Sequence, residues 1–205
     1  AGTGGRVVGG TGGGPRCHPG LERRGQGMGS CGLTWGMVTN GHARSEANVA
    51  RLVNGGISSV TVSLDGLRAS HDWLRGVDGS FARATAGIRR LAAAGLPFMD
   101  VVTCVNPRNL DELPALQGLL ADLGVRSWRL FSIFPKGRAR QNPELIMDAE
   151  QFSRMLAFID HQRRALEGSD FSLQFSCEGY LPDDLDARVR DEPYFCRAGV
   201  SIASV

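Results

Sequence analysis

The sequence predicts an α/β fold in which parallel strands alternate with helices, on three observations. Short apolar strands recur about every 30 residues, with a helical segment between them. The strand bodies within residues 36–41 and 59–66 are apolar, as in strands that are buried on both faces. Each of these strands ends in polar residues followed by glycine, at the edge where parallel sheets bind ligands. We therefore expect an open or barrel-like sheet whose function lies at the carboxyl ends of its strands.

Length and composition limit the class of protein. With 205 residues, 42% of them hydrophobic, the chain can bury the core of one domain and part of a second. The net charge is +2, and the charged residues are scattered, so we expect neither a nucleic-acid-binding stripe nor a basic membrane patch. No apolar run reaches the roughly 18 residues of a membrane span, and the sequence does not start like a signal peptide. We expect a cytoplasmic protein with small-molecule or peptide ligands.

Glycine crowds two stretches near the start of the chain, residues 1–14 and 25–32. Apolar residues show little helical spacing there, so both stretches are predicted mainly as loop. Residues 6–10 are the exception, because they resemble a short strand that leads into a glycine-rich loop at residues 11–15. A loop of this kind can bring its backbone close to a ligand.

Capping residues place the helices. Ser45, Ser80 and Asp148 are predicted N-caps, because each side chain can accept a hydrogen bond from the first turn of a helix. Glycine ends several of these segments, as Gly55 does after the first of them. The expected helices span residues 46–54, 81–94, 110–123 and 149–166.

Strands are expected where short apolar runs lie between turn residues. The stretch between residues 66 and 80, which holds His71, Asp72 and Arg75, is predicted as loop. After residue 177 the pattern changes to an acidic, helical or irregular stretch, so a different module is expected to start there. Besides residues 6–10, the expected strands span residues 33–39, 57–64, 98–105, 125–134, 171–176 and 200–205.

Common metal and phosphate sites are not indicated. The four histidines share no metal-ligand spacing, and the glycine-rich loop has neither the GxGxxG pattern nor a following lysine with serine or threonine. The five cysteines are an odd number with no CxxC pair, so we expect no disulfides, and each is by default a small buried hydrophobe. They are Cys17, Cys31, Cys104, Cys177 and Cys196.

Short motifs follow one another in a particular order. They are Gly12-Gly13-Gly14-Pro15, Val38-Thr39-Asn40-Gly41, Ser63-Leu64-Asp65-Gly66, His71-Asp72 and Leu74-Arg75-Gly76, with Gly79-Ser80-Phe81 after them. In this order the set resembles the core of the radical S-adenosylmethionine (SAM) enzymes that carry a C-terminal SPASM domain. The first motif is similar to the Gly-Gly-Glu-Pro loop of that family. The resemblance covers about residues 9–205.

The resemblance implies a partial (β/α)6 barrel of the TIM-like type. In this family a [4Fe-4S] cluster reduces and cleaves bound SAM, giving a 5′-deoxyadenosyl radical that abstracts a substrate hydrogen. An electron donor such as flavodoxin or ferredoxin and a peptide or protein substrate are the partners it implies. Residues 1–176 would form the core without its first strand and cluster loop. Residues 177–205 would be a linker and the start of a truncated SPASM-type domain.

The resemblance also assigns SAM contacts. Gly12 and Gly13 would meet the SAM amino group through their backbone, with Gly14 standing where the family has an acid. Ser63 and Arg75 resemble two further SAM contacts of the family. Arg75 would pair with the SAM carboxylate, because a guanidinium fork suits a planar carboxylate.

Other candidate residues keep two interpretations. Asn40 and Asp65 each precede a glycine, so each is either a turn residue or a ligand of the cofactor. Ile133 and Phe134 would lie beside the adenine, or else belong to the core. Cys196 resembles the first cysteine of a SPASM domain, which ligates an auxiliary Fe-S cluster.

A basic loop follows the strand expected at residues 125–134. It contains Lys136, Arg138 and Arg140. A solvated surface is one interpretation, and binding of an acidic peptide or a substrate carboxylate is the other.

The sequence departs from the family in one major respect, because it has no CxxxCxxC motif for the SAM cluster. Two explanations follow, a piece of a larger enzyme or a degenerate, non-catalytic α/β binding domain that lost the cluster. A third hypothesis is an unrelated barrel or doubly wound enzyme that uses Asp65 or Asp72 as an acid or base.

Overall fold

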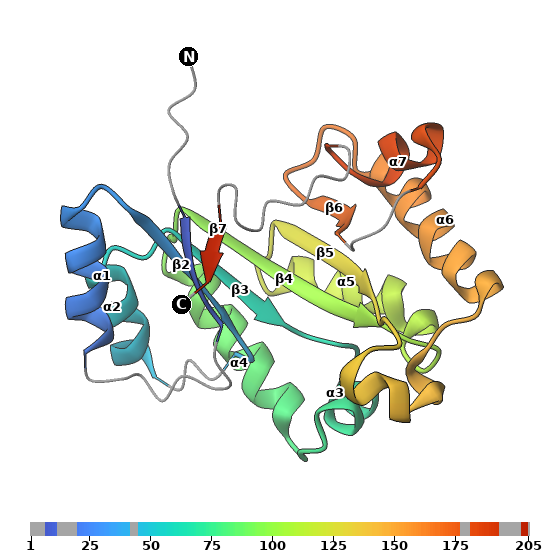
Figure 1. Cartoon of the computed structure of the whole chain (residues 1–205), viewed down its shortest axis with the longest axis horizontal. Helices are drawn as coiled ribbons and strands as arrows, with labels where there is room; N and C mark the ends of the chain where they lie inside the picture. Colours follow the sequence, from blue (N-terminus) through green and yellow to red (C-terminus); the bar gives the residue numbers. More distant parts are fainter. Residues whose placement is uncertain (1–6, 12–19, 42–44, 177–180, 193–201, 205) are drawn as a thin grey trace. The chain divides into compact units, whose positions relative to one another are not determined.

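A computed structural model describes residues 7–11, 20–41, 45–176, 181–192 and 202–204 of the chain (Figure 1). The chain divides into two compact units. The first unit comprises residues 1–63, 82–100 and 196–205, and the second comprises residues 64–81 and 101–195.

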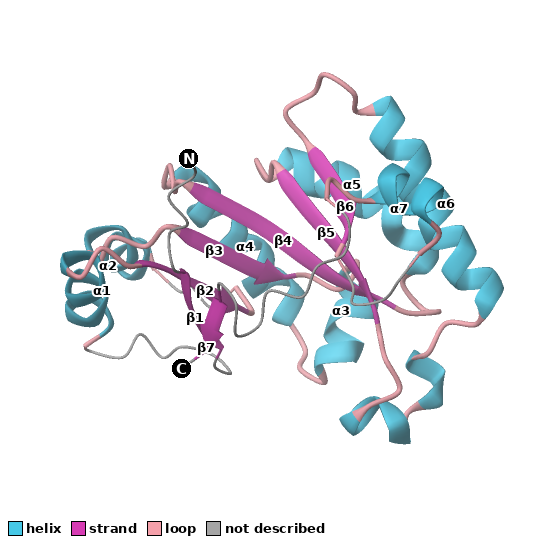
Figure 2. Cartoon of the chain, turned by 45° about the horizontal axis from the view of Figure 1, so that its top comes forward, coloured by secondary structure: helices cyan, strands magenta, loops and turns pink. Residues whose placement is uncertain are grey.

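The first unit contains parallel strands, drawn as arrows in Figure 2. They are β1 (Val7–Thr11), β2 (Thr34–Thr39), β3 (Ser59–Ser63) and β7 (Ile202–Ser204), in the order β3-β2-β1-β7. In the register, Gly36 of β2 lies between Gly9 of β1 and Ser59 of β3. The predicted strands at residues 6–10, 33–39 and 57–64 are confirmed, with bounds that differ by one or two residues, and β7 lies within the strand predicted at residues 200–205.

Helix α2 (Glu46–Asn54) connects β2 to β3 and has the predicted bounds. Ser45 caps it as expected, because its hydroxyl accepts a hydrogen bond from the Asn48 amide at 3.3 Å. The buried side chains of the helix, Val49 and Leu52, lie three residues apart and so share one face.

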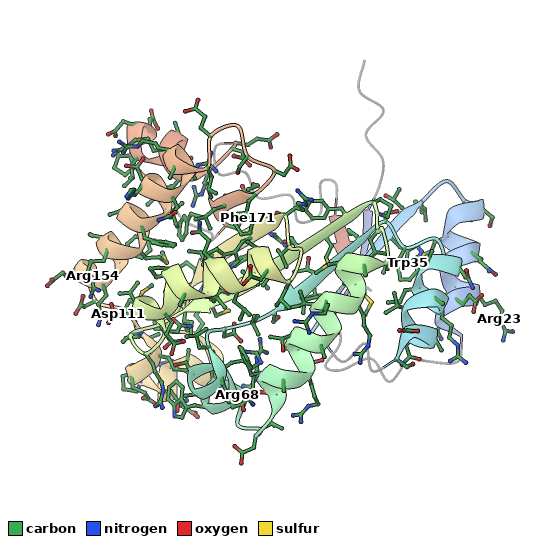
Figure 3. All side chains as sticks on the ribbon, turned by 180° about the vertical axis from the view of Figure 1, so that it is seen from behind. Arg23, Trp35, Arg68, Asp111, Arg154 and Phe171 are labelled. Atoms are coloured by element: carbon green, nitrogen blue, oxygen red, sulfur yellow. The ribbon has the colours of Figure 1, made fainter. Side chains whose placement is uncertain are left out.

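Helix α1 (Leu21–Ser30) corrects the prediction of loop at residues 25–32. Glycine is a weak helix former, but Gly25 allows close packing within the first unit. A Cβ atom at this position would lie 2.3 Å from the Gly55 carbonyl oxygen and 2.7 Å from the ring of Trp35. The indole of Trp35, labelled in Figure 3, donates a hydrogen bond to that carbonyl at 2.8 Å. Tertiary packing therefore outweighs the low helix propensity.

The second unit is built on the parallel order β6-β5-β4. Strand β4 (Phe98–Val105) starts in the first unit and continues in the second, where it pairs with β5 (Ser127–Ser132), which pairs with β6 (Ser172–Phe175). All three were predicted, with β5 ending before Ile133.

Helices and short 3₁₀ turns surround these strands. They are α3 (Arg68–Arg75), η1 (Leu110–Glu112), α5 (Leu113–Asp122), η2 (Gly137–Gln141), η3 (Pro143–Leu145), α6 (Ala149–Ala165) and α7 (Asp183–Val189). The predicted cap of α6 is confirmed, since Asp148 and Gln151 exchange side-chain to backbone hydrogen bonds in a capping box. The fully buried core includes Leu113, Leu116, Leu120, Trp128, Leu130, Met155, Ile159, Leu173 and Phe175.

Helix α3 is a second correction, because its residues were predicted as loop. It ends at Gly76, which takes a left-handed conformation with φ of 62°. Helix α4 (Ser80–Ala93) follows, and the predicted cap Ser80 is its first residue instead. The carboxylate of Asp72 accepts hydrogen bonds from the amides of Gly79 and Phe81 and from the Ser80 hydroxyl, at 2.6 to 2.9 Å.

Within the described residues, every helix is too short or too polar to span a bilayer.

Candidate cofactor-binding site at the strand ends

A buried aspartate organises the turn that follows β3. Asp65 is 1% exposed, and its Oδ1 accepts a hydrogen bond from the Cys104 amide of β4 at 3.0 Å. The Thr103 hydroxyl donates to the Leu64 carbonyl at 2.6 Å and accepts from the Trp128 indole at 2.9 Å. These bonds fix the carboxyl end of the segment that contains Asp65 against the end of β4.

Arg75 lies against the same carboxylate. Its Nη2 is 2.5 Å from Asp65 Oδ2, so α3 and the turn after β3 share an ion pair. The two atoms are close enough for an ion pair, but their angles are not those of a hydrogen bond. Asp65 Oδ2 is therefore buried without a hydrogen bond among the described residues. Opposite charges attract without strict alignment, so the short distance makes this contact an ion pair. The Arg75 side chain is 34% exposed, so the guanidinium reaches the surface.

His71 holds the backbone of this turn. Its Nδ1 accepts a hydrogen bond from the Asp65 amide at 2.9 Å, which places the proton of the neutral ring on Nε2. Burial lowers the pKa of His71, the charge of Asp65 opposes this shift, and the charge of Arg75 adds to it. A neutral ring suits an acceptor role, so the 3.9 Å approach of Nδ1 to Asp65 Oδ2 is not an ion pair.

Two residues that the sequence analysis missed complete the turn. Asn109 is fully buried and donates to the carbonyls of Asp65 at 2.7 Å and Cys104 at 3.0 Å. Glu112 accepts from the Leu67 amide at 2.8 Å through Oε2. The one feature of the sequence that could have pointed to Asn109 is its position in the turn that follows the predicted strand at residues 98–105.

Gly66 is required where the turn passes Glu112. Its φ of 134° is one that other residues rarely adopt. A Cβ atom there would lie 2.7 Å from Glu112 Oε2. The glycine of the Ser-Leu-Asp-Gly motif therefore has a packing reason of its own.

Asn40 and Ser63 lie in the first unit. Asn40 precedes Gly41, whose φ is 79°, and a Cβ on Gly41 would lie 2.6 Å from the Cα of Ala84. Gly87 of α4 faces the same turn, because a Cβ atom on Gly87 would lie 2.0 Å from the Gly41 carbonyl oxygen. Ser63 ends β3 half-buried, and its hydroxyl makes no hydrogen bond within the described part of the chain.

Ile133 and Phe134 follow β5 in the second unit. Ile133 is half-buried, whereas Phe134 is 47% exposed, so the core interpretation fails for Phe134. The Phe134 carbonyl accepts a hydrogen bond from the Lys136 amide at 2.7 Å, which turns the chain sharply after the strand. Since Ser132 pairs with Val105 of β4, this segment leaves the sheet at the same edge as the Asp65 turn.

The structure brings Asp65 and Arg75 together and gives no position for three other candidates. Gly12, Gly13 and Cys196 lie outside the described residues. Within the described residues, no group of three histidines, cysteines or acidic residues is placed to hold a metal ion. Cys31 is an exposed free thiol and Cys104 is a half-buried one, so the prediction of a buried hydrophobe is wrong for Cys31.

Comparisons with known proteins match the chain to one family model and to several relatives. A family model described as "Radical SAM superfamily" matches residues 1–120. The chain is 36% identical over 115 residues to an AdoMet-dependent heme synthase of Methanosarcina barkeri, covering 56% of this chain and 33% of the relative. It is 28% identical over 158 residues to the sporulation killing factor maturation protein SkfB of Bacillus subtilis, covering 71% of this chain and 38% of the relative. The chain thus spans about a third of the length of these relatives.

Solved structures share the fold. Streptococcus suis SuiB bound to the precursor peptide SuiA superposes with a TM-score of 0.65 at 12% identity, covering 82% of this chain and 38% of SuiB. A domain of a pyruvate-formate lyase-activating enzyme from Bacteroides vulgatus gives 0.60 at 17% identity, covering 86% of this chain and all of that domain. The predicted α/β class is confirmed by these likenesses.

Proposed function

Because the chain belongs to the radical SAM superfamily, as the match over residues 1–120 shows, we propose that it is the SAM-binding part of an enzyme that cleaves SAM reductively to a 5′-deoxyadenosyl radical. The match to this family confirms the radical SAM resemblance that was predicted from the order of the motifs. The ion pair of Asp65 with the partly exposed Arg75 is the observation that carries this proposal.

Arg75 would bind the SAM carboxylate. One guanidinium nitrogen lies against Asp65 in an ion pair, and the group makes no hydrogen bond within the described residues, so its N–H donors remain for a ligand. A guanidinium fork can give a carboxylate two parallel hydrogen bonds. Asp65 is buried and would act as a positioning residue that holds Arg75. The Ser63 hydroxyl, without a protein partner in the described residues, would donate to or accept from a SAM oxygen.

The remaining predicted contacts belong to the same proposal. Gly12 and Gly13 would offer backbone groups to the SAM amino group, and Asn40 would face the cofactor from the end of β2. Ile133 and Phe134 would contact the adenine, for which the exposed ring of Phe134 is suited.

An iron–sulfur cluster does not fit the residues present. In this family a [4Fe-4S] cluster supplies the electron that breaks a carbon–sulfur bond of SAM. The 205 residues contain no CxxxCxxC motif, and the described residues contain no group of metal ligands. We propose that cysteines outside this sequence hold the cluster, that Cys196 ligates an auxiliary cluster in a SPASM-type domain starting near residue 177, and that a flavodoxin or ferredoxin delivers electrons. The alternative is a non-catalytic domain that binds SAM alone.

A peptide or protein side chain is the substrate we propose. The fold likeness to SuiB with its precursor peptide and the similarity to SkfB support a peptide. The heme synthase of Methanosarcina barkeri, at 36% identity, favours a tetrapyrrole as the second candidate.

The test uses the full-length gene product, reconstituted anaerobically with iron and sulfide. With dithionite and SAM, we expect the visible absorption of a cluster and formation of 5′-deoxyadenosine. Arg75→Ala should weaken SAM binding by about 10- to 100-fold, because a charged hydrogen bond contributes about 1.5–3 kcal/mol. Arg154→Ala, which removes an exposed arginine paired with Asp111 (Figure 3), is the control and should bind SAM normally.

The outcomes separate the hypotheses. SAM binding without a cluster or 5′-deoxyadenosine would support the non-catalytic alternative. Failure of the wild-type protein to bind SAM, or equal binding by the Arg75→Ala and wild-type proteins, would overturn the assigned site.

A further inference from the structure

Helix α3 carries Arg75, and the start of this helix is held from a distant part of the chain. Its N-cap position is Leu67, whose apolar side chain makes no capping hydrogen bond. Glu112 of η1 supplies the missing acceptors: its Oε2 accepts from the Leu67 amide at 2.8 Å, and its Oε1 accepts from the Ser70 hydroxyl at 2.7 Å. A carboxylate also suits this end of the helix, because the N-terminus carries partial positive charge. Both oxygens of one side chain therefore fix the first turn of α3.

The helix depends on such support because it is short. It spans eight residues, and an isolated helix of fewer than roughly 12 residues is marginal in water. Its buried side chains are both polar, Ser70 and His71. The first donates to Glu112, and the second accepts from the Asp65 amide. Directional hydrogen bonds, more than apolar packing, therefore set where α3 lies.

One short segment positions both partners of the ion pair between Asp65 and Arg75. Asn109, which directly precedes η1, donates to the Asp65 carbonyl at 2.7 Å, while Glu112 holds the helix that ends at Arg75. Gly66 lies between the two contacts, because a Cβ atom there would be 2.7 Å from Glu112 Oε2 and 3.2 Å from the Asn109 Cβ. The packing leaves no room for a side chain, so a shift of η1 would move both charged groups.

From these contacts we propose that Glu112 is a positioning residue for SAM binding, which acts through α3 to aim the Arg75 guanidinium at the SAM carboxylate. The proposal rests on the SAM site proposed above and adds a residue that needs no contact with the cofactor. A guanidinium gives a carboxylate two parallel hydrogen bonds only when the two groups are aligned, and a misplacement of about 1 Å is costly. Without Glu112 the first turn of α3 would lose both acceptors, and Arg75 would lose its alignment.

The test is a double-mutant cycle on SAM affinity, measured by isothermal titration calorimetry with the reconstituted full-length protein. The variants are Glu112→Ala, Arg75→Ala and the two combined. Asp111→Ala is the matched control, because Asp111 belongs to the same 3₁₀ turn and its carboxylate pairs with Arg154 (Figure 3). It removes the same charge from the same element and leaves the contacts of Glu112 in place.

Two further variants separate positioning from loss of the fold. Glu112→Gln keeps an oxygen for the Leu67 amide, and its amide nitrogen can donate to the Ser70 hydroxyl, so SAM affinity should stay within about twofold of wild type. Ser70→Ala removes one of the two contacts and should weaken SAM binding less than Glu112→Ala does. Thermal unfolding shows which variants are folded at the temperature of the titration. If Glu112→Ala does not fold, the cycle is measured with Ser70→Ala in its place.

We expect Glu112→Ala to weaken SAM binding about 10-fold, a coupling typical of residues in one network, and to change it less than about twofold once Arg75 is replaced by alanine. Asp111→Ala should bind SAM as wild type does. The role of Glu112 would be overturned by an equal loss with and without Arg75, by an equal loss in Asp111→Ala, or by wild-type affinity of Glu112→Ala where Arg75→Ala binds weakly. Equal binding by Arg75→Ala and wild type would instead overturn the SAM site itself, so the two failures are distinguishable.

Discussion

At the scale of single residues, Asp72 is a structural cap. Its carboxylate joins the last turn of α3 to the first turn of α4, and hydrogen bonds from the Phe81 amide, the Ser80 hydroxyl and the Gly79 amide lower its pKa to about 2. A carboxylate held in this way is a poor acid or base near neutral pH. The hypothesis of an unrelated enzyme that uses Asp72 as its acid or base therefore loses its physical basis.

Asp72→Asn should destabilise the protein in a pH-dependent way. The pKa is depressed from 3.8 to about 2 on folding, so the stabilisation is complete above pH 3.8 and disappears as the pH falls toward 2. Urea unfolding at several pH values between 7 and 3 should show the gap between wild type and variant narrowing at acid pH. Asp122→Asn, which removes an exposed carboxylate at the end of α5, is the control, and its free energy of unfolding should stay close to that of wild type. A gap that stays constant with pH would contradict the role given to the charge.

His71 should make stability fall as the pH decreases below its ordinary pKa of 6.5. Burial lowers the pKa of the folded form, so the unfolded chain binds more protons below pH 6.5 and unfolding is favoured there. His71→Gln keeps a hydrogen-bond acceptor for the Asp65 amide but cannot titrate. We expect the urea midpoint of wild type to drop more than that of the variant between pH 7 and pH 5. His161→Gln, exposed on α6, should behave as wild type, and equal slopes for all three proteins would refute the burial argument.

At the scale of elements, helix α1 shows how close packing against neighbouring residues can outweigh a low helix propensity. It contains three glycines in ten residues. Gly25 faces Trp35 and the Gly55 carbonyl, whereas Gly27 has open space where a Cβ would be. Glycine is therefore needed for packing at position 25, whereas at position 27 it only lowers the helix propensity.

Gly27→Ala and Gly25→Ala should therefore change stability in opposite directions. Alanine at position 27 should raise the free energy of unfolding by about 1 kcal/mol, the difference in helix propensity. Alanine at position 25 should lower it, because the backbone oxygen of Gly55 cannot move as a flexible side chain could. Thermal unfolding of both variants tests this, and a stabilised Gly25→Ala protein would show that α1 does not pack as described.

Caps could be predicted from the sequence because both partners lie within a few residues. Ser45 and Asp148 accept from amides three residues ahead. Helix α3 was missed because its N-cap, Leu67, makes no side-chain hydrogen bond to the helix, so no capping residue marks its start. The first turn of α4 is capped by Asp72, nine residues before Phe81, and not by the nearer Ser80. Boundaries set by neighbouring residues are visible in a sequence, and those set by a side chain from another element are not.

At the scale of the whole molecule, the same limit explains which parts of the site were predicted. The motif order identified Asp65 and Arg75 separately, as candidate ligands. Their pairing was not predicted, and the bonds from Cys104, Asn109 and Glu112 to this turn join residues 39 to 45 positions apart. No short pattern reveals contacts of that separation. Ser63 and Arg75 belong to different units, so their convergence stays a prediction.

Native-state hydrogen exchange should differ strongly across the chain. Strands β4 and β5 carry fully buried residues such as Val101, Val105 and Leu130, and their amides should exchange slowest. Helix α1, rich in glycine and largely exposed, should exchange fastest among the helices. Mass spectrometry of exchanged peptides measures this order, and protection of α1 equal to that of β5 would contradict it.

The three tryptophans occupy three different surroundings, and this has an optical consequence. Trp35 is 3% exposed in the first unit, Trp128 is 0% exposed in the second, and Trp73 is 40% exposed on α3 with the Arg108 guanidinium 4.6 Å from its ring centroid. Indole emission shifts to the red when the ring meets water. In variants that retain a single tryptophan, the emission wavelength of Trp35 should therefore follow unfolding of the first unit and that of Trp128 unfolding of the second. The emission of Trp73 should follow α3, the helix that carries Arg75.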